Sequence, residues 1–343
     1  MLKKTLITSG LMCITAMAMA ESSADLYGSI RTQIENVQVD QAKAGEDKSY
    51  SGIRDAYSRF GIKASHLLKN GITLNAKIEI PFNTQRLSME DPSFFEGFYK
   101  DNRDPRLYQI GASGDWGSVT IGKQWLAYYN NIAYPVDYFS SFYSGFATHA
   151  TVRREAMTYS SPSINGFNAT LSMVDMTDGN NTSYLDTNQY ALSYANNGFN
   201  VALAYQDSIK GSADILGASL SFTTGPWRFA TKLEQLNSPS GTANPDPRIY
   251  NLYASYQLNN YTFKAHYAKG DESADGSSFF QGNSYHLGVD YQYTKNFKVF
   301  LEYFFEDHGY AIYTPNTETF DVLAGYHTQT DGSVFTIGAR YDF

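Results

Sequence analysis

The last eleven residues of the chain, 333–343, alternate strictly between two kinds of side chain. Successive side chains of a strand point to opposite faces, so one face of this segment is apolar. That face carries Phe335, Ile337, Ala339, Tyr341 and Phe343. In a soluble sheet such a face packs on a core, whereas in a membrane barrel it meets lipid, with aromatic residues at the two interfaces. The rest of the sequence distinguishes between these structures.

The first twenty residues have the organisation of a secretory signal peptide. Lys3 and Lys4 precede a short apolar run, and Ala18-Met19-Ala20 matches an A-x-A cleavage site. The apolar run is too short to be a membrane-spanning helix. We therefore expect residues 1–20 to be a signal peptide and residues 21–343 to form one exported domain.

Composition excludes several classes of function. The formal net charge is -8, and removal of the two lysines in the expected signal peptide gives -8 - 2 = -10 for the mature chain. An acidic chain of this kind is a poor nucleic-acid binder. The only cysteine, Cys13, lies within the expected signal peptide, so the mature chain has neither a disulfide framework nor thiol chemistry. The 28 Tyr and 22 Phe residues make it rich in the aromatics that suit membrane interfaces.

The mature chain repeats one unit of about ten alternating residues, the length of a tilted membrane strand. Such segments occur near 26–34, 59–64, 72–80, 105–114, 117–126, 153–161, 166–176, 187–196, 198–207, 213–224, 226–237, 248–258, 261–270, 283–293, 296–307, 318–329 and 333–343. Their connections alternate between tight turns, such as Asn196-Asn197-Gly198, and long polar loops, such as 38–53. Short turns at one rim and long loops at the other are typical of an outer-membrane barrel.

The number of segments sets the strand count. A bacterial barrel needs an even number of strands, and the seventeen segments are one too many. We assign 318–329 to a hairpin arm within the last external loop. The predicted fold is therefore an all-β, transmembrane antiparallel β-barrel of 16 strands, with short periplasmic turns and long external loops. In segments such as 261–268, aromatic and aliphatic side chains face outward and polar side chains face a wet lumen.

Several short motifs, in order along the chain, resemble those of the trimeric, 16-stranded general porins of Gram-negative bacteria. They are Leu26-Tyr27-Gly28, Ser58-Arg59-Phe60-Gly61, the segment 117–124, Tyr159-Ser160-Ser161-Pro162, Asn165-Gly166-Phe167 and the closing segment 338–343. The resemblance implies a water-filled channel for passive diffusion of small hydrophilic solutes and ions. It also implies a homotrimer in the Gram-negative outer membrane, in contact with lipid and lipopolysaccharide. The trimer would pack through the outer faces of the first and last strands, with the second loop, 83–104, latching onto a neighbour.

The resemblance also implies a third loop folded into the lumen and a C-terminal Phe, here Phe343, that the barrel-assembly machinery reads. Residues 127–152 fall where that third loop belongs, and they alternate little. The family usually has several carboxylates there, whereas this loop offers only Asp137, with Glu155 just beyond it. The loop is rich in aromatics such as Tyr138, which either pack it against the wall or form a track for flat or sugar-like solutes.

Cations are predicted on the wall opposite this loop. Alternation places Arg31, Arg59, Lys63 and Lys77 on inward faces, and Arg106 stands where the family has a lumenal arginine. Strict alternation would direct Lys123 into lipid, which costs roughly 2–4 kcal/mol. We therefore expect a bulge at Gly122 that turns Lys123 inward. The predicted pore constriction consists of Arg31, Arg59, Lys63, Lys77, Arg106, Lys123, Asp137 and Tyr138.

Two groups of charges with opposite sign are expected to set the ionic preference. The lumen wall is basic, whereas the external stretches 177–187, 270–282 and 306–332 contain carboxylates and no Lys or Arg. Salt screens charges in the mouth beyond about 8–10 Å and screens a narrow constriction less. We therefore expect a weak cation preference in dilute salt that fades or reverses toward anions as the salt concentration rises.

No sequence pattern supports catalysis, and no cofactor is expected. The chain has no H-E-x-x-H motif and no G-x-S-x-G elbow with partner residues. His266 and His286 face the lumen on adjacent strands, without a nearby third ligand for a metal. An outer-membrane phospholipase would need a Ser/His pair on the lipid-facing wall, and every wall histidine that alternation places faces inward. Two alternatives to a passive channel stay open: an adhesin or receptor that uses the external loops, and a barrel enzyme.

Overall fold

The structure, a computed structural model, describes residues 22–39, 49–85, 87–89, 105–143, 146–174, 187–208, 213–237, 246–271, 280–307, 312 and 331–343. The predicted signal peptide, the segment 318–329 and most of the predicted external loops lie outside these residues. Within the described residues, no helix is both long and apolar enough to cross a membrane.

Seventeen labelled strands make up most of the described chain. They are β1 (Ser22–Val39), β2 (Tyr50–Asp55), β3 (Arg59–Leu67), β4 (Thr73–Pro81), β5 (Leu107–Gly114), β6 (Gly117–Trp125), β7 (Arg153–Ser160), β8 (Phe167–Val174), β9 (Thr187–Asn196), β10 (Phe199–Ser208), β11 (Asp214–Thr224), β12 (Trp227–Asn237), β13 (Arg248–Leu258), β14 (Tyr261–Gly270), β15 (Gly282–Thr294), β16 (Phe297–Glu306) and β17 (Gly332–Asp342). Two short helices, η2 (Tyr129–Ala133) and η3 (Tyr134–Val136), lie between β6 and β7.

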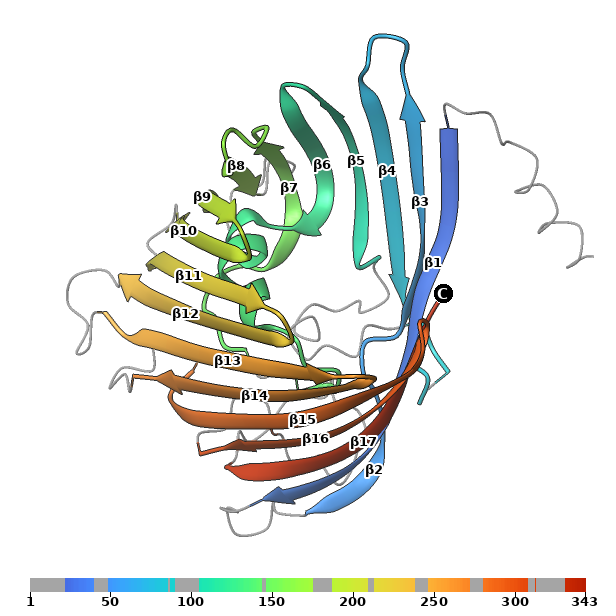
Figure 1. Cartoon of the computed structure of the whole chain (residues 1–343), viewed down its shortest axis with the longest axis vertical. Helices are drawn as coiled ribbons and strands as arrows, with labels where there is room; N and C mark the ends of the chain where they lie inside the picture. Colours follow the sequence, from blue (N-terminus) through green and yellow to red (C-terminus); the bar gives the residue numbers. More distant parts are fainter. Residues whose placement is uncertain are drawn as a thin grey trace, which may run out of the picture.

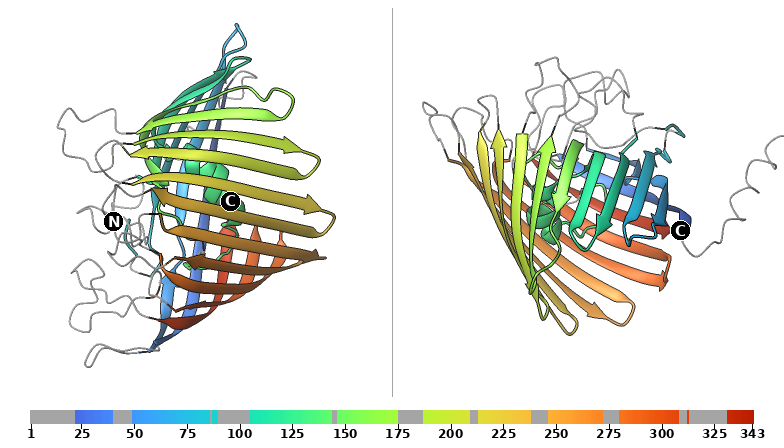
Figure 2. Two further views of the ribbon diagram at one scale, coloured as in Figure 1. Left: turned by 90° about the vertical axis from the view of Figure 1, so that its left-hand side faces the viewer. Right: turned by 90° about the horizontal axis from the view of Figure 1, so that it is seen from above.

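The strands form a closed antiparallel barrel. Each strand from β3 to β17 pairs with its sequence neighbours, and β1 closes the ring by pairing Ser29–Val39 with Gly332–Asp342 of β17. Figure 1 shows the strands surrounding a central space that holds the helices, and Figure 2 shows the strands running side by side at a tilt. Apart from β2, for which the described residues show pairing with β1 alone, every labelled strand pairs with a neighbour on both sides, which is the condition for crossing a membrane with strands.

The labels β2 and β3 belong to one wall strand with a break. Both pair with β1, β2 along Thr32–Val37 and β3 along Ser22–Ser29, so the seventeen labels describe a barrel of 16 strands, as predicted. At the break, Tyr57 has φ 69°. The Ser58 hydroxyl takes the place of missing backbone hydrogen bonds between the strands. It accepts from the Arg31 N–H (2.8 Å) and donates to the Arg31 carbonyl (3.1 Å). The prediction of a loop over 38–53 is therefore wrong at both ends, because β1 runs to Val39 and β2 begins at Tyr50.

The predicted division into two faces is confirmed. Along β14, Tyr261, Phe263 and Ala265 are exposed on the outer face, whereas Lys264 and His266 are buried inside. The same alternation holds in β10, β15 and β17. Exposed aromatics stand near both ends of the strands, among them Phe199, Trp227 and Tyr293 beside the turns and Tyr190, Tyr250 and Tyr285 toward the opposite rim. This arrangement matches an apolar band with an aromatic girdle at each membrane interface.

The predicted tight turns are also confirmed, and they gather at one rim of the barrel (Figure 2), here called the turn rim. Asn197 and Gly198 connect β9 to β10 with φ of 47° and 83°. Positive φ at both central residues is the backbone of the turn that best matches the twist of two antiparallel strands. Asn and Gly are the residues that adopt it at the lowest cost, which explains their choice here.

The C-terminal residue completes the barrel closure at this rim. The Phe343 N–H donates to the Gly28 carbonyl (3.1 Å), and the Gly28 N–H donates to the Phe343 carbonyl (2.9 Å). The ring of Phe343 occupies the space that a side chain at position 28 would need. Gly28 is therefore required by the close approach of Phe343, and the two ends of the domain are held together.

Candidate pore constriction

The third loop, 126–152, folds into the barrel instead of extending from it. Figure 1 shows η2 and η3 inside the ring of strands. Tyr128 and Ile132 are fully buried against small wall residues, including Ala202 and Ala204 of β10. A side chain at Gly217 of β11 would collide with the Tyr128 phenol. Small inward residues on β10 and β11 thus create the space that the helices fill, and the predicted folded-in loop is observed.

One wall carboxylate, Glu302 of β16, holds the middle of the loop. Its two oxygens accept the backbone N–H groups of Ser140 (2.8 Å) and Ser141 (3.0 Å). Lys264 lies 2.9 Å from the same carboxylate and also 2.8 Å from Asp290. Buried N–H groups need acceptors and a buried carboxylate needs a cation, and this arrangement provides both. The loop position is therefore fixed by ionic hydrogen bonds as well as by packing.

A second carboxylate, Glu234 of β12, holds both ends of the loop. It accepts from the Tyr128 hydroxyl (3.1 Å), the Thr148 hydroxyl (2.6 Å) and the His149 backbone N–H (2.6 Å). Lys232 lies 3.0 Å from it and donates to the Ala147 carbonyl. Further loop N–H groups are accepted by inward-facing wall amides, namely Gln33, Gln189, Gln206 and Asn251. The loop backbone thus replaces water with wall side chains over most of its length.

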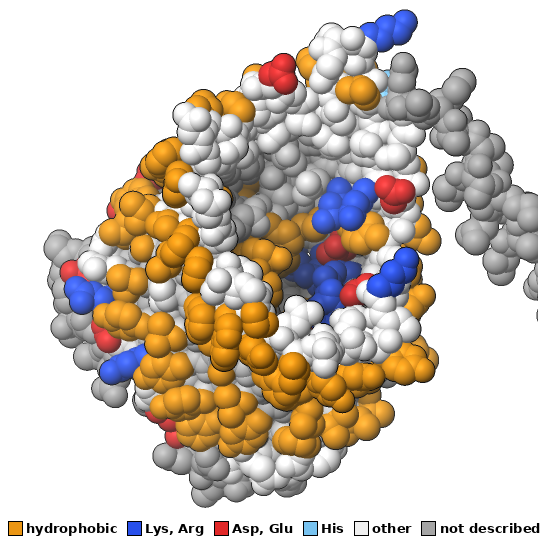
Figure 3. Space-filling model, viewed as in Figure 1, with side chains coloured by type: hydrophobic (Ala, Val, Ile, Leu, Met, Phe, Trp, Pro, Cys, Tyr) orange, Lys and Arg blue, Asp and Glu red, His pale blue; other side chains and the backbone are white. Residues whose placement is uncertain are grey.

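Three arginines gather on the wall opposite the loop. Arg59 and Arg106 flank the buried carboxylate of Glu79, at 3.7 Å and 3.3 Å, and Glu79 also accepts from the Tyr27 hydroxyl. Arg31 donates to the Ser29 hydroxyl (2.8 Å). Figure 3 shows Lys and Arg side chains together with acidic ones inside the hollow of the barrel. We call Arg31, Arg59 and Arg106 the arginine cluster.

Asp137 is the loop carboxylate that acts on this cluster. It follows η3 and accepts a hydrogen bond from the Tyr129 hydroxyl (2.8 Å). Burial raises the pKa of Asp137 to about 6, against the opposing effects of the Tyr129 hydrogen bond and of the charges of Arg31 and Arg59. Asp137 therefore carries its full negative charge only above neutral pH.

Two other predicted constriction residues, Lys63 and Lys77, adjoin the arginine cluster through Tyr27, whose hydroxyl donates to Glu79. Lys63 and Lys77 are cross-strand partners, and their ammonium groups lie 4.5 Å and 5.4 Å from the centre of the Tyr27 ring. Tyr138 packs on Tyr253 of β13 (5.5 Å between ring centres), in the wall that the loop packs against, and beneath the guanidinium of Arg228 (4.5 Å). The two lysines therefore continue the basic wall of the arginine cluster, whereas Tyr138 packs against Tyr253 and Arg228.

The predicted bulge at Gly122 is wrong. The pairing of β6 with β5 and with β7 continues through Gly122 without a register shift, although Gly122 has φ 118°. Lys123 is 8% exposed and lies opposite Tyr108 and Glu155, which hydrogen bond to each other (2.7 Å). Tyr108 belongs to the outer face, where it pairs with the exposed Ile78. The register therefore groups Lys123 with outer-wall residues and not with the arginine cluster.

Sequence reasoning missed the acidic residues that organise the site, Glu79, Glu234 and Glu302. Each lies on the lumenal face of its strand, so alternation contained the signal. From the sequence alone, a carboxylate on a lumenal face cannot be distinguished from a solvated side chain unless its partner in the loop is known. The cation Arg228 was missed for the same reason.

Known proteins resemble this chain in sequence and in fold. A family model described as Gram-negative porin matches residues 8–309. An outer membrane porin protein of Bordetella pertussis is 27% identical over 313 residues, which cover 84% of this chain and 73% of that protein.

Solved structures share the fold at lower identity. The anion-selective porin from Comamonas acidovorans has a TM-score of 0.67 at 18% identity, covering 94% of this chain and 100% of that chain. OmpF of Salmonella typhi, in a complex with daunomycin, has a TM-score of 0.67 at 17% identity, covering 93% and 97%. A trimer form of OmpT from Vibrio cholerae has a TM-score of 0.64 at 17% identity, covering 94% and 100%. With a matching family model over most of its length and a closed 16-stranded barrel, the chain belongs to the Gram-negative porin family and forms an outer-membrane channel for passive diffusion.

Proposed function

We propose that passage of small hydrophilic solutes and ions is controlled between the arginine cluster and the third loop. The observation that carries this proposal is the excess of cations there. Three guanidinium groups face one wall carboxylate, Glu79, and one loop carboxylate, Asp137, whose pKa is raised to about 6. The neighbouring Arg340 is paired with Asp342 and leaves this excess unchanged. Charges that line a narrow pore act strongly on permeating ions, because little water screens them. The constriction should therefore favour anions.

The preference should depend on salt concentration. Most acidic residues of the external stretches lie outside the described residues, so their influence stays a prediction from the sequence. Under a KCl gradient we expect the reversal potential to indicate a weak cation preference in dilute salt, and to shift toward anions as salt screens the mouth. Planar-bilayer recordings at low and high mean salt measure this. A strong anion preference already at low salt would show that the arginine cluster dominates throughout.

The same recordings test the channel against other functions. Stepwise conductance of purified protein is expected, and lipid release without conductance would favour an enzyme. His66 lies beyond the alternating segment 59–64, so the sequence did not place it. It faces outward, pairs with the exposed Leu74 and shares a 2.6 Å hydrogen bond with the Ser22 hydroxyl. Within the described residues no carboxylate hydrogen bonds to His66, so this pair lacks the third group of a catalytic triad. We propose that the protein has no catalytic role.

We further propose that the channel is a homotrimer, exported by the signal peptide 1–20. The outer wall of β3 to β6 is hollowed by an apolar depression of about 470 Å³, lined by residues such as Ile62, Ile78 and Ile110. Leu87 and Met89, at the start of the predicted latching loop, are 91% and 53% exposed. Exposed apolar surface of this kind favours contact with lipid or with another subunit. The trimer form of the Vibrio cholerae relative is consistent with a subunit contact.

Deleting Phe343 should leave misassembled protein in the periplasm. The deletion removes the backbone pair with Gly28 and the aromatic that ends the outward row of β17, which the assembly machinery is proposed to read. The measurement is the amount of heat-sensitive trimer in outer-membrane fractions, with Phe343→Tyr as a control that keeps an aromatic end. Trimer at the normal level after the deletion would refute the proposed role of Phe343.

A further inference from the structure

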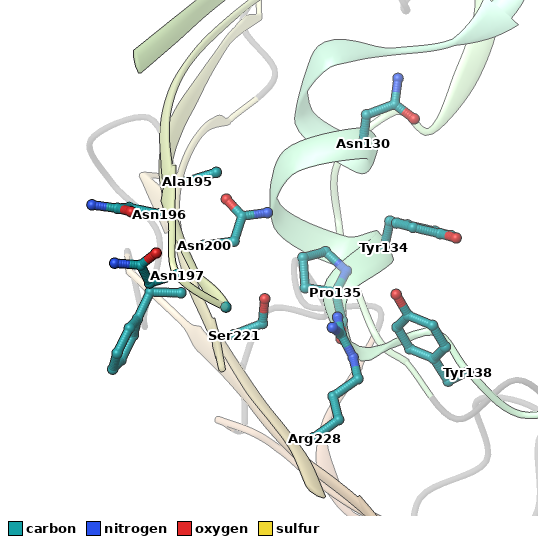
Figure 4. A pocket seen from close by; sticks show the side chains of 12 residues that line it. Asn130, Tyr134, Pro135, Tyr138, Ala195, Asn196, Asn197, Asn200, Ser221 and Arg228 are labelled. Carbon is teal, nitrogen blue, oxygen red and sulfur yellow. The ribbon is translucent and has the colours of Figure 1, made fainter. Parts of the chain in front are cut away.

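A second lumenal site lies at the turn rim, apart from the arginine cluster. It is a cavity of about 500 Å³ between η2 and η3 on one side and the ends of β9 to β12 on the other (Figure 4). We propose that this cavity binds a small hydroxylated ring that carries a carboxylate, such as a sugar acid. The proposal rests on the channel function but not on the ionic preference of the constriction.

One side of the cavity offers neutral hydrogen-bonding groups. Asn200 of β10 and Ser221 of β11 are cross-strand partners, and both line the cavity with Asn130 of η2. Figure 4 shows the Asn200 amide directed across the space toward η2. An amide presents an acceptor and two donors, and a hydroxyl presents both functions, so these groups can bind adjacent hydroxyls of a ring. The set is suited to a polyhydroxylated solute.

Two tyrosines supply flat surfaces next to these groups. Tyr134 and Tyr138 have ring centres 5.6 Å apart, and Tyr134 is 49% exposed. The faces of aromatic rings that are exposed on a loop inside a lumen can contact a solute, because neighbouring side chains do not cover them. Binding sites for small molecules combine such apolar faces with a few placed polar groups, in volumes of about 300–1,000 Å³.

Among the described residues that line the cavity, Arg228 of β12 alone is charged. Its guanidinium lies 4.5 Å from the centre of the Tyr138 ring, and it donates to the Thr223 hydroxyl (3.3 Å) and the Pro135 carbonyl (3.4 Å). Within the described residues it forms no ion pair, and its Nε is buried without a hydrogen-bond partner. Each terminal nitrogen of the guanidinium carries two N–H groups and uses one of them in these hydrogen bonds, so donors remain for a carboxylate.

The combination of groups selects the ligand. A neutral sugar would leave the Arg228 charge without a counter-ion, and a simple carboxylate such as acetate would leave the amides and tyrosines without contacts. A ring with hydroxyls and one carboxylate satisfies both sets. Because the cavity opens at the turn rim, a solute that has passed the constriction would meet it before leaving the channel.

Single-channel recordings with three probes test the proposal. Glucuronate carries both ring hydroxyls and the carboxylate, glucose carries only the hydroxylated ring, and acetate carries only the charge. Glucuronate should produce resolved current interruptions with a Kd about tenfold lower than that of glucose or acetate, the size of one charge-assisted hydrogen bond. Equal effects of glucuronate and acetate, or of glucuronate and glucose, would overturn the proposal. Absence of stepwise conductance in any condition would instead refute the channel function.

Variants locate the effect in the cavity. Arg228→Gln should raise the Kd for glucuronate about tenfold while leaving that for glucose unchanged. The matched control is Arg248→Gln, which removes an exposed arginine at the end of β13 that lies away from the turn rim. It should not change the Kd for glucuronate. If Arg228→Gln yields no channels, the glucuronate Kd is compared between Tyr138→Leu and Tyr138→Phe. Only the phenylalanine keeps the ring face, so the leucine variant should bind glucuronate more weakly. Equal glucuronate Kd values in these two variants would overturn the assignment of Tyr138.

Discussion

Replacing Glu302 with alanine should free the middle of the third loop and enlarge the conducting path. The carboxylate accepts both the Ser140 and Ser141 N–H groups and neutralises Lys264. Its removal leaves two buried donors without acceptors and weakens the pairing of a buried cation, a loss of about 3–5 kcal/mol for a broken buried ion pair. Asp290 also accepts from the Ser140 hydroxyl (3.2 Å), but Lys264 and Lys298 already share this carboxylate. We expect higher single-channel conductance and larger current noise than in the parent channel.

Two controls separate loop release from a general loss of stability. Ser140→Ala removes a hydroxyl but keeps the backbone N–H that Glu302 binds, so this variant should conduct like the parent. Glu302→Gln keeps one acceptor oxygen and the side-chain volume, so its effect should be intermediate. Trimer content and thermal unfolding are measured for all three variants. Parental conductance and noise in a folded Glu302→Ala channel would show that packing alone positions the loop.

The sequence was sufficient for the wall of the barrel wherever that wall lies in lipid. Outward side chains are apolar there and inward ones polar, so alternation marks the strands, as in β14. The alternation of apolar and polar residues is lost where a strand extends beyond the lipid-facing band. In β2, the outward Ser51 faces the equally polar Asn36 of β1, so nothing distinguishes the two faces and the segment reads as a loop. Water on both sides removes the physical cause of the pattern.

The site was only partly predictable for a related reason. Alternation fixes the face of a residue, which placed Arg31 and Arg59 correctly in the lumen. It does not show which loop atoms a wall residue meets. Ser140 and Glu302 are 162 residues apart in the sequence, and their contact depends on the path of the third loop through the barrel. The prediction that Lys123 turns inward is wrong for a different reason. The cost expected for a charge facing lipid assumed that Lys123 had no neighbouring carboxylate, whereas Glu155 is its cross-strand partner.

The ionic preference should shift toward anions as the pH falls from about 8 to about 5. Burial raises the pKa of Asp137 to about 6, so its carboxylate is charged at the upper pH and protonated at the lower. Protonation removes the loop charge that opposes Arg31 and Arg59. A unit charge at about 4 Å in water is worth about 1 kcal/mol, which corresponds to about a fivefold change in the ratio of anion to cation permeability. Reversal potentials at fixed salt and stepped pH measure the change.

Substitutions identify Asp137 as the titrating group. Asp137→Asn has no charge at either pH, so it should show the low-pH preference throughout and lose the step. Tyr129→Phe removes the hydrogen bond that favours the charged form, so the pKa of Asp137 should rise and the midpoint of the step should move to higher pH. Carboxyl groups in model peptides have pKa values near 4, below this range. A step near pH 6 that persists in Asp137→Asn would assign the titration to another group and leave the arginine cluster without a pH-dependent counter-charge.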